Sequence, residues 1–214
     1  MREFIFISDF DGTITQKDFY WILLDDYIGQ KGIDFYYEWK KSKKIGTEFL
    51  NTVFKWYEFT EVEKNEALDK VLLDKDLEKT VGLVEERGGE FIILSAGFDY
   101  YIQDALEKRG LNHLKLLTNH GKFINNSFVM EPDESSPYHS DIYGIDKEKV
   151  AIHYRKQCKK LYFAGDSEPD YLAALQADVI FAKHELARLL EVNNISYIPY
   201  DNFNDILSEM KKGV

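Results

Sequence analysis

Two carboxylates, Asp9 and Asp11, have the clearest chemical potential in this sequence, because they follow an apolar run at residues 4–7 almost directly. Four consecutive apolar residues are typical of a strand that is buried on both faces of a parallel sheet. Ligands of open α/β sheets bind at the carboxyl ends of the strands, where both side chains would lie. Gly12 permits a backbone turn that few other residues adopt. The segment therefore predicts an acidic site at a sheet edge.

Two structural explanations of this acidic segment fit the residues less well. A calcium-binding EF-hand loop needs oxygen ligands at several positions and a glutamate at its twelfth, but the twelfth residue counted from Asp9 is Tyr20. A helix-capping turn would explain one aspartate, but not two that flank Phe10 directly after a strand. The pattern Asp-x-Asp-Gly-Thr at residues 9–13 is therefore better explained by chemistry than by local structure.

A second apolar run at residues 91–94 ends at Ser95, Ala96 and Gly97. Apolar residues then recur at helical spacing at positions 98, 101, 102, 105 and 106, and Gly110 closes the predicted helix. A small hydroxyl at a strand end, followed by backbone amides that open a helix, suits a phosphate group. Many α/β turns have this composition, so the segment is informative only in combination with Asp9.

The strongest signal after the first one lies near residue 166. Residues 161–164 predict a strand, and Asp166 and Asp170 follow it, with Pro169 in the first turn of a helix. Further upstream, Asp146 can cap a helix that begins with Lys147 and contains Lys149 two residues later. A cation is mildly unfavourable at a helix N-terminus, so a lysine there becomes notable where an anion binds nearby.

In their order along the chain, the four segments resemble the four motifs of the haloacid dehalogenase (HAD) superfamily, and specifically of its phosphatases. The segments are residues 9–13, residues 95–97, the lysines at 147 and 149, and residues 165–170. The resemblance implies that Asp9 is a nucleophile that forms an aspartyl-phosphate, and that Asp11 is the general acid and base. It also implies Mg²⁺ as the cofactor. The ion would be held by the Asp9 side chain, the Asp11 backbone carbonyl and Asp166, with Asp170 as a second ligand or a supporting carboxylate.

The resemblance further assigns the phosphate-binding residues. Ser95 would hold a phosphoryl oxygen together with Ala96 and Gly97, and Lys147 would offset the negative charge of the phosphate. Lys149 is the alternative for this third motif. Asp11 separates the sequence from the ion pumps of the superfamily, which have threonine at this position, and this favours a phosphatase over a stable phospho-enzyme.

The predicted fold is α/β, with a Rossmann-like parallel sheet core that has helices on both faces. Residues 1–15 and 90–214 would form the core domain, and residues 16–89 an inserted helical-bundle cap of the C1 type. Amphipathic segments predict a first helix that Asp18 can cap and Gly29 ends. Further helices are predicted from about residue 33 to 44, from residue 46, after a capping box at residues 60–63, and at residues 77–87.

Aromatic residues are concentrated in the predicted cap, where most of them should form the bundle core. Phe19, Tyr20 and Trp21 lie closest in sequence to the catalytic loop and are the predicted substrate contacts of the cap. The simplest interpretation of the lysines at positions 40, 41, 43 and 44 is a solvated helix face.

The remaining segments carry weaker signals. A strand at residues 114–118 and a hairpin around residues 125–126 are predicted, and residues 131–143 should form an ordered loop near the site. The histidines are scattered without metal-ligand spacing, and His120 is best explained as a surface residue. Residues 184–214 predict a helix, a short strand at 196–198 and a helix, without a chemical role.

Composition excludes several functional classes. The formal net charge of −11 argues against nucleic acid and anionic membranes as partners. Cys158 is the only cysteine, so no internal disulfide is possible. No apolar run approaches the ~20 residues of a membrane span, and residues 1–3 leave no room for a signal peptide, so we expect a cytoplasmic protein. The oligomeric state stays open.

The expected function is hydrolysis of a small phosphorylated metabolite. Residues 8–15, 165–170 and 198–203 resemble the methionine-salvage phosphatases that act on 2-hydroxy-3-keto-5-methylthiopentenyl-1-phosphate, and an aromatic cap would suit a thioether. That group carries a cysteine-rich loop where residues 131–146 have no cysteine. Phosphoserine, phosphocholine and phosphoethanolamine are alternative substrates, although residues 16–86 offer no arginine for a carboxylate. A phosphomutase or a non-catalytic phosphate-binding protein would be a less favoured alternative.

Overall fold

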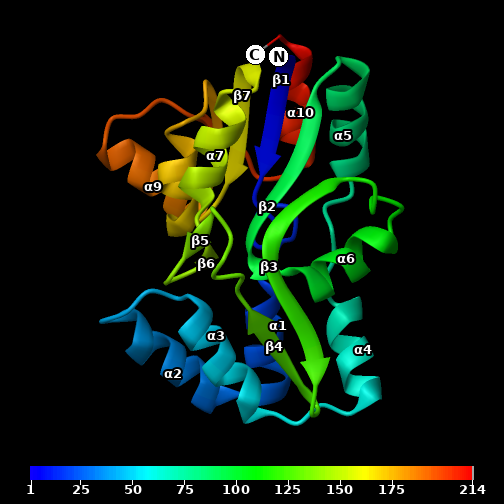
Figure 1. Ribbon diagram of the computed structural model, residues 1–214, viewed down its shortest axis with the longest axis vertical. Helices are drawn as coiled ribbons and strands as arrows, with labels where there is room; N and C mark the ends of the chain where they lie inside the picture. Colours follow the sequence, from blue (N-terminus) through cyan, green and yellow to red (C-terminus); the bar gives the residue numbers. More distant parts are fainter. Residues whose placement is uncertain (214) are drawn as a thin grey trace.

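The computed structural model describes residues 1–213 and is built around a seven-stranded sheet (Figure 1). The strands, in their spatial order, are β4 (Ser127–Glu131), β3 (Lys115–Ile124), β2 (Glu90–Phe98), β1 (Arg2–Ser8), β7 (Cys158–Gly165), β8 (Val179–Ala182) and β9 (Ile198–Pro199). All neighbouring strands are parallel except the β3–β4 pair. The predicted α/β class with a mostly parallel sheet is confirmed.

The central strand β1 is buried on both faces, as its continuous apolar run predicts. Ile5 and Ile7 pack into one hydrophobic cluster, whereas Phe6 packs into the other, where its ring stacks on Phe91. This double burial fixes the register of β1 against β2 and β7, because a one-residue slip would exchange the two faces. Asp9 therefore leaves the sheet at a defined position.

Helices cover both faces of the sheet. The helices on the Ile5 side are α7 (Lys147–Arg155), the short η3 (Glu168–Asp170) and α8 (Tyr171–Ala174), and α9 (His184–Val192). The helices on the Phe6 side are α5 (Leu77–Glu86), α6 (Asp99–Glu107) and α10 (Phe203–Lys211). Both chain termini lie at one end of the molecule (Figure 1).

A helical segment between β1 and α5 lies at the other end of the molecule, beside the lower ends of β3 and β4 in Figure 1. Its elements are α1 (Phe19–Leu23), the π-helical η1 (Leu24–Ile28), α2 (Gln30–Lys40), α3 (Thr47–Val53), the 3₁₀-helical η2 (Phe54–Trp56) and α4 (Glu61–Asp69). The capping box at Thr60 and Glu63 is present as predicted. None of these helices, nor any other within residues 1–213, has the length and apolar character that a membrane crossing requires.

The prediction that the Asp18 side chain caps the first helix is wrong. Asp18 occupies the N-cap position, but within the described chain its side chain accepts no capping hydrogen bond. The Phe19 N–H instead donates to Asp11 Oδ1 at 2.9 Å. A longer-range acceptor has therefore replaced the local cap, and it joins the Asp9–Asp11 loop to the helical segment.

The β3–β4 hairpin turns at Asn125 and Asn126, both with positive φ, as the Asn-Asn pair predicts. Its strands pack against the helical segment, where the Asn51 side chain exchanges two hydrogen bonds with the Met130 backbone. The next segment contains a small antiparallel pair, β5 (His139–Ser140) and β6 (Gly144–Ile145), so the expectation of a loop without regular structure is wrong there.

Candidate active site

The Asp9–Asp11 loop leaves β1 at the carboxyl edge of the sheet. The Asp9 N–H donates to the Ala164 carbonyl at 2.9 Å, which extends the β1–β7 pairing by one residue. Gly12 has a φ of 73°, and a Cβ at this position would meet Asp166 Oδ2 at 2.5 Å. Glycine is therefore required here for its backbone conformation and for space, and it lets the loop pass directly beside Asp166.

Lys147 is the buried cation of the site. Its ammonium lies 2.5 Å from Asp9 Oδ1 and 2.7 Å from Asp170 Oδ1. The first turn of α7 positions it, and the Asp146 side chain caps this helix by accepting the Lys149 N–H at 3.1 Å. The Lys149 ammonium is exposed and donates to the His139 carbonyl instead. The structure thus brings Lys147 to Asp9 and places Lys149 outside the site.

Burial and neighbouring charges shift the pKa values of this cluster. Burial by itself lowers the pKa of the Lys147 ammonium, but Asp170 and Asp9 more than offset this, so its pKa is raised above the usual value. Burial and the Asp170 carboxylate raise the pKa of Asp9 well above its usual value, although Lys147 opposes the shift. Without a further cation, this pocket of carboxylates is therefore short of positive charge.

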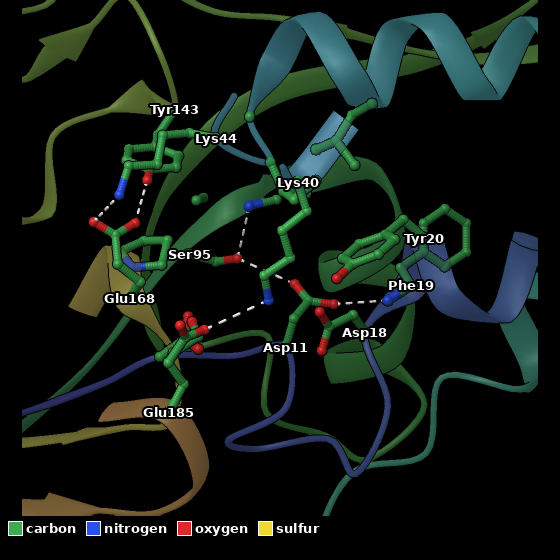
Figure 2. A pocket seen from close by; sticks show the side chains of 18 of the residues that line it. Asp11, Asp18, Phe19, Tyr20, Lys40, Lys44, Ser95, Tyr143, Glu168 and Glu185 are labelled. Atoms are coloured by element: carbon green, nitrogen blue, oxygen red, sulfur yellow. Dashed lines mark hydrogen bonds and ion pairs between the residues drawn. The ribbon is translucent and has the colours of Figure 1, made fainter. Parts of the chain in front are cut away.

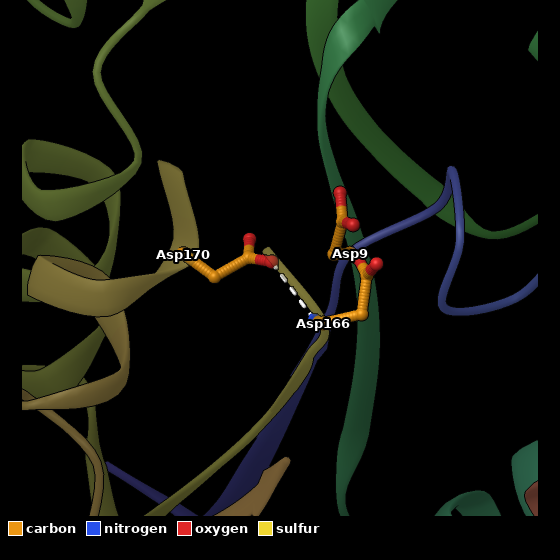
Figure 3. Close-up of side chains that lie close together, drawn as sticks. All are labelled: Asp9, Asp166 and Asp170. Atoms are coloured by element: carbon orange, nitrogen blue, oxygen red, sulfur yellow. Dashed lines mark hydrogen bonds between the residues drawn. The ribbon is translucent and has the colours of Figure 1, made fainter. Parts of the chain in front are cut away.

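The structure brings three carboxylates together at a possible metal site. Asp9, Asp166 and Asp170 each offer an oxygen within 4.8 Å of the others (Figure 3). Asp170 is already engaged, because Lys147 binds one of its oxygens and the N–H groups of Asp166 and Ser167 donate to the other at 3.0 and 3.1 Å. Asp9 and Asp166 are the more available ligands, whereas Asp170 supports them. A hard divalent cation fits this set of oxygens and the shortage of positive charge.

Asp11 has a different environment from that of Asp9. Its Oδ2 accepts hydrogen bonds from the Tyr101 hydroxyl and, at 3.3 Å, from the Ser95 hydroxyl (Figure 2). Burial raises the pKa of the Asp11 carboxyl, although the hydrogen bonds from Tyr101 and Phe19 oppose the shift. A raised pKa favours a carboxyl that carries a proton for part of the time, as a general acid must.

Ser95, Ala96 and Gly97 lie beside Asp11, but their local structure differs from the prediction. Strand β2 continues to Phe98 and shifts register between Leu94 and Phe98, so α6 begins only at Asp99. The three residues therefore form an irregular strand end, not the start of a helix. The Gly97 N–H donates to Ser95 Oγ at 2.9 Å, which holds the hydroxyl beside Asp11.

Asp9, Asp11, Lys147 and residues 95–97 line a pocket of about 430 Å³ (Figure 2), which side chains of the helical segment also line. The predicted residues that line it are Asp9, Asp11, Ser95, Ala96, Gly97, Lys147, Phe19 and Tyr20. Trp21 is not among the described residues of the lining and packs against Tyr36 instead, with ring centroids 4.6 Å apart. Trp21 therefore lies outside the pocket lining, unlike the two other predicted cap contacts.

Several lining residues were not predicted as site residues from the sequence. Lys40, Lys41, Lys43 and Lys44 are exposed, as their interpretation as solvated lysines predicts, and they also border the pocket. Tyr101 and Tyr143 also line it, as do Glu168 and Glu185. The segment after residue 184, which was predicted to have no chemical role, therefore contributes Glu185 to the pocket. His120 is exposed, as its surface interpretation predicts, and it lies outside the pocket lining. Its Nδ1 lies 2.9 Å from Asp99 Oδ2.

Asp18 lines the pocket beside Asp11 (Figure 2) and gives a prediction for the pH dependence of stability. Burial, followed by the carboxylates of Asp11 and Asp166, raises its pKa from 3.8 to about 7. A carboxyl whose pKa is raised by folding contributes stability below about pH 4, and this contribution is lost as the pH rises through about 7. We expect the unfolding temperature of metal-free Asp18→Asn to fall less between pH 5 and pH 8 than that of the wild type. An equal fall in both proteins would contradict the shift, and exposed Asp141→Asn serves as the control.

Solved structures of phosphoserine phosphatases have the same fold. A phosphoserine phosphatase with an analogue of its phospho-aspartyl intermediate superimposes with a TM-score of 0.70 at 16% identity, covering 98% of this chain and 99% of that one. A substrate-bound phosphoserine phosphatase gives a TM-score of 0.71 at 16% identity, with 98% of each chain covered. These likenesses show that this chain has the fold of the phosphoserine phosphatases, and they confirm at the level of the fold the resemblance predicted from the motifs.

Curated relatives make the comparison more specific. A protein of Lysinibacillus sphaericus (strain C3-41), named 2-hydroxy-3-keto-5-methylthiopentenyl-1-phosphate phosphatase, is 27% identical over 228 residues, covering 97% of this chain and 93% of its own length. A protein of the same name from Bacillus cereus (strain ATCC 10987 / NRS 248) is 23% identical and covers 95% of this chain and 94% of its own length. No protein-family model matches the chain.

Proposed function

We propose that this protein is a Mg²⁺-dependent phosphomonoesterase that works through an aspartyl-phosphate on Asp9. The observation that supports the proposal best is that Asp9, Asp11 and Lys147 line one pocket, while a carboxylate oxygen of Asp166 lies within 4.8 Å of one of Asp9. These groups come from two sheet-edge segments, after β1 and after β7, and from the start of α7. Phosphoryl transfer needs alignment and charge neutralisation, which such a cluster supplies.

The proposed first step uses both aspartates of the loop. An oxygen of Asp9 bonds to phosphorus as the ester P–O bond breaks, and Asp11 gives its proton to the departing alkoxide. In the second step, Asp11 takes a proton from a water molecule that attacks phosphorus, the Asp9–phosphorus bond breaks, and inorganic phosphate leaves. The raised pKa of Asp11 supports the first half of this exchange.

The residues around the phosphoryl group would divide the remaining tasks. Asp9, Asp166 and the Asp11 carbonyl would hold Mg²⁺, which neutralises charge on the phosphoryl oxygens when it is bound. Lys147 would contact another phosphoryl oxygen, and Asp170 would keep the Lys147 ammonium in place. Ser95, with Ala96 and Gly97, would bind a further phosphoryl oxygen.

The proposed substrate is 2-hydroxy-3-keto-5-methylthiopentenyl-1-phosphate, as in the names of the curated relatives. Of the predicted cap at residues 16–89, the helical segment before α5 would lie over the core at residues 1–15 and 90–214, whereas α5 packs on the sheet. Phe19, Tyr20, Leu50 and Phe54 of this segment would form an apolar wall for a thioether chain. Phosphoserine is less well supported, because no arginine is among the described residues that line the pocket.

The test is release of inorganic phosphate from a panel of phosphomonoesters, with Mg²⁺ and with an excess of chelator. The panel contains the methylthiopentenyl phosphate, phosphoserine, phosphocholine and phosphoethanolamine. We expect turnover to be highest on the first compound and to fall at least about a hundredfold in chelator, because the carboxylates would then repel the phosphate. Equal rates in chelator would contradict the metal assignment. A preference for another ester would contradict the substrate assignment, and binding without release would favour a non-catalytic protein.

A further inference from the structure

Two lysine–glutamate pairs span the mouth of the pocket. Lys40, at the end of α2, lies 3.8 Å from Glu185 of α9, and Lys44 lies 2.7 Å from Glu168 of η3. Both lysines come from the helical segment and both glutamates from the sheet side. Figure 2 shows Lys40 extending into the pocket toward Glu185, with Tyr20 and Asp18 on the other side of Lys40. Each pair therefore joins opposite walls of the pocket.

Further contacts hold both pairs in position. The Tyr143 hydroxyl donates to the second oxygen of Glu168 at 2.5 Å. The Lys40 ammonium also donates to the Tyr36 hydroxyl at 3.3 Å. The neighbouring lysines are neutralised on their own side, because Lys41 pairs with Glu38 and Lys43 with Glu48. Each of the four lysines that border the pocket thus has a carboxylate partner.

From this arrangement we propose that the mouth selects phosphomonoesters whose organic group carries no charge. The inference rests on the proposed phosphatase function and narrows its substrate class. A carboxylate on the substrate would have to compete with Glu185 or Glu168 for a lysine, and an ammonium would have to compete with Lys40 or Lys44 for a glutamate. A neutral group makes neither exchange necessary.

The size of the effect follows from the exposure of the pairs. The side chains of Lys40 and Glu185 are 50% and 38% exposed, so water screens part of any charge that a substitution leaves unpaired. One unpaired charge at the pocket, screened to this extent, should change kcat/KM for a charged ester by roughly three- to tenfold. Such a change should become smaller as salt is added.

The experiment compares three small esters that differ mainly in the charge of the organic group. Glycerol 3-phosphate is neutral there, 3-phosphoglycerate has a carboxylate in place of one CH₂OH group, and phosphoethanolamine has an ammonium. We expect wild-type kcat/KM to be highest for glycerol 3-phosphate. The quantity compared is the ratio of kcat/KM between two esters. Where turnover of one ester is too slow to measure, the ratio of the dissociation constants of both esters with Mg²⁺ is used instead.

Single substitutions then remove one charge at a time. Glu185→Gln removes the carboxylate partner of Lys40, and with it that of Arg188 at 3.8 Å. Glu168→Gln removes the carboxylate partner of Lys44 while keeping an acceptor for Tyr143. Both should raise the rate on 3-phosphoglycerate relative to glycerol 3-phosphate by about three- to tenfold. Lys40→Gln should shift the preference toward phosphoethanolamine instead. The control is Glu3→Gln, which makes the same charge change beside Lys159. This pair lies near the N-terminus, at the end of the molecule opposite the helical segment (Figure 1), so all ratios should stay unchanged.

Opposite shifts for Glu185→Gln and Lys40→Gln would support charge selection, because a purely structural role would change all three esters together. Unchanged ratios in both variants, or a wild-type preference for either charged ester, would overturn the inference. Failure of the proposed function is a separate result, namely phosphate release that persists in Asp9→Asn or that is absent from every ester tested.

Discussion

Asp9→Asn should abolish phosphate release, with a loss in kcat of at least about a thousandfold. An amide oxygen is a poor nucleophile for phosphorus, and the variant retains the size and shape of the side chain, so alignment at the site is kept. The measurement is steady-state phosphate release with Mg²⁺ for the wild type and the variant. Activity within tenfold of wild type would exclude Asp9 as the nucleophile.

The thermal stability of the same variant provides the control for folding. The ionised Asp9 is unfavourable in the metal-free protein, since burial and Asp170 raise its pKa well above the usual value. A neutral amide removes this unfavourable charge, and Lys147 still has Asp170 as a partner. The unfolding temperature of metal-free Asp9→Asn should therefore not be lower than that of the wild type, and a loss of activity cannot then be attributed to unfolding.

Lys147→Ala should lower both activity and stability. Without the ammonium, Asp9 and Asp170 lose their shared counter-charge, and breaking a buried ion pair in this way costs about 3–5 kcal/mol of unfolding free energy. The loss in kcat/KM should be at least about a hundredfold, because a phosphate would also lose a cation at the site. Both quantities can be measured by denaturant titration and by phosphate release well below the unfolding temperature.

Lys149→Ala is the matched control, since it removes the same side chain two residues further along α7. Lys149 is exposed and contacts a backbone carbonyl at the surface, so its removal should change stability by less than about 0.5 kcal/mol. Its effect on kcat/KM should stay within about threefold. If Lys149→Ala costs more activity than Lys147→Ala, the phosphate-binding role belongs to Lys149.

The sequence is most informative where the chemistry is local. Asp9 and Asp11 could be predicted because they directly follow a strand whose apolar run is continuous. Asp166 could be predicted for the same reason, and parallel strands bring their carboxyl ends to one sheet edge. The α/β class, the Asn125–Asn126 turn and the Thr60 capping box were also predictable, because neighbouring residues determine each of them.

The contacts that the sequence did not reveal are long-range. Tyr101 fits the apolar pattern of α6 and resembles a core residue, yet its hydroxyl reaches Asp11. Glu185 has no local signal, because its partner Lys40 comes from the helical segment. Trp21 and Tyr20 are adjacent, but about 100° of helical rotation separates their side chains, so only Tyr20 reaches the pocket. Helix capping by Asp18 failed for a similar reason, because Asp11 accepts the Phe19 N–H instead.

The β3–β4 hairpin has a mechanical consequence for access to the pocket. It is joined to the helical segment by the Asn51–Met130 hydrogen bonds, by Ser127 Oγ donating to the Phe54 carbonyl, and by the Phe59 N–H donating to the Asn126 carbonyl. A hinge that used only the two chain connections at the ends of the segment would have to break all of these bonds. A motion that widened the pocket and kept these hydrogen bonds would therefore have to carry the hairpin along with the helical segment.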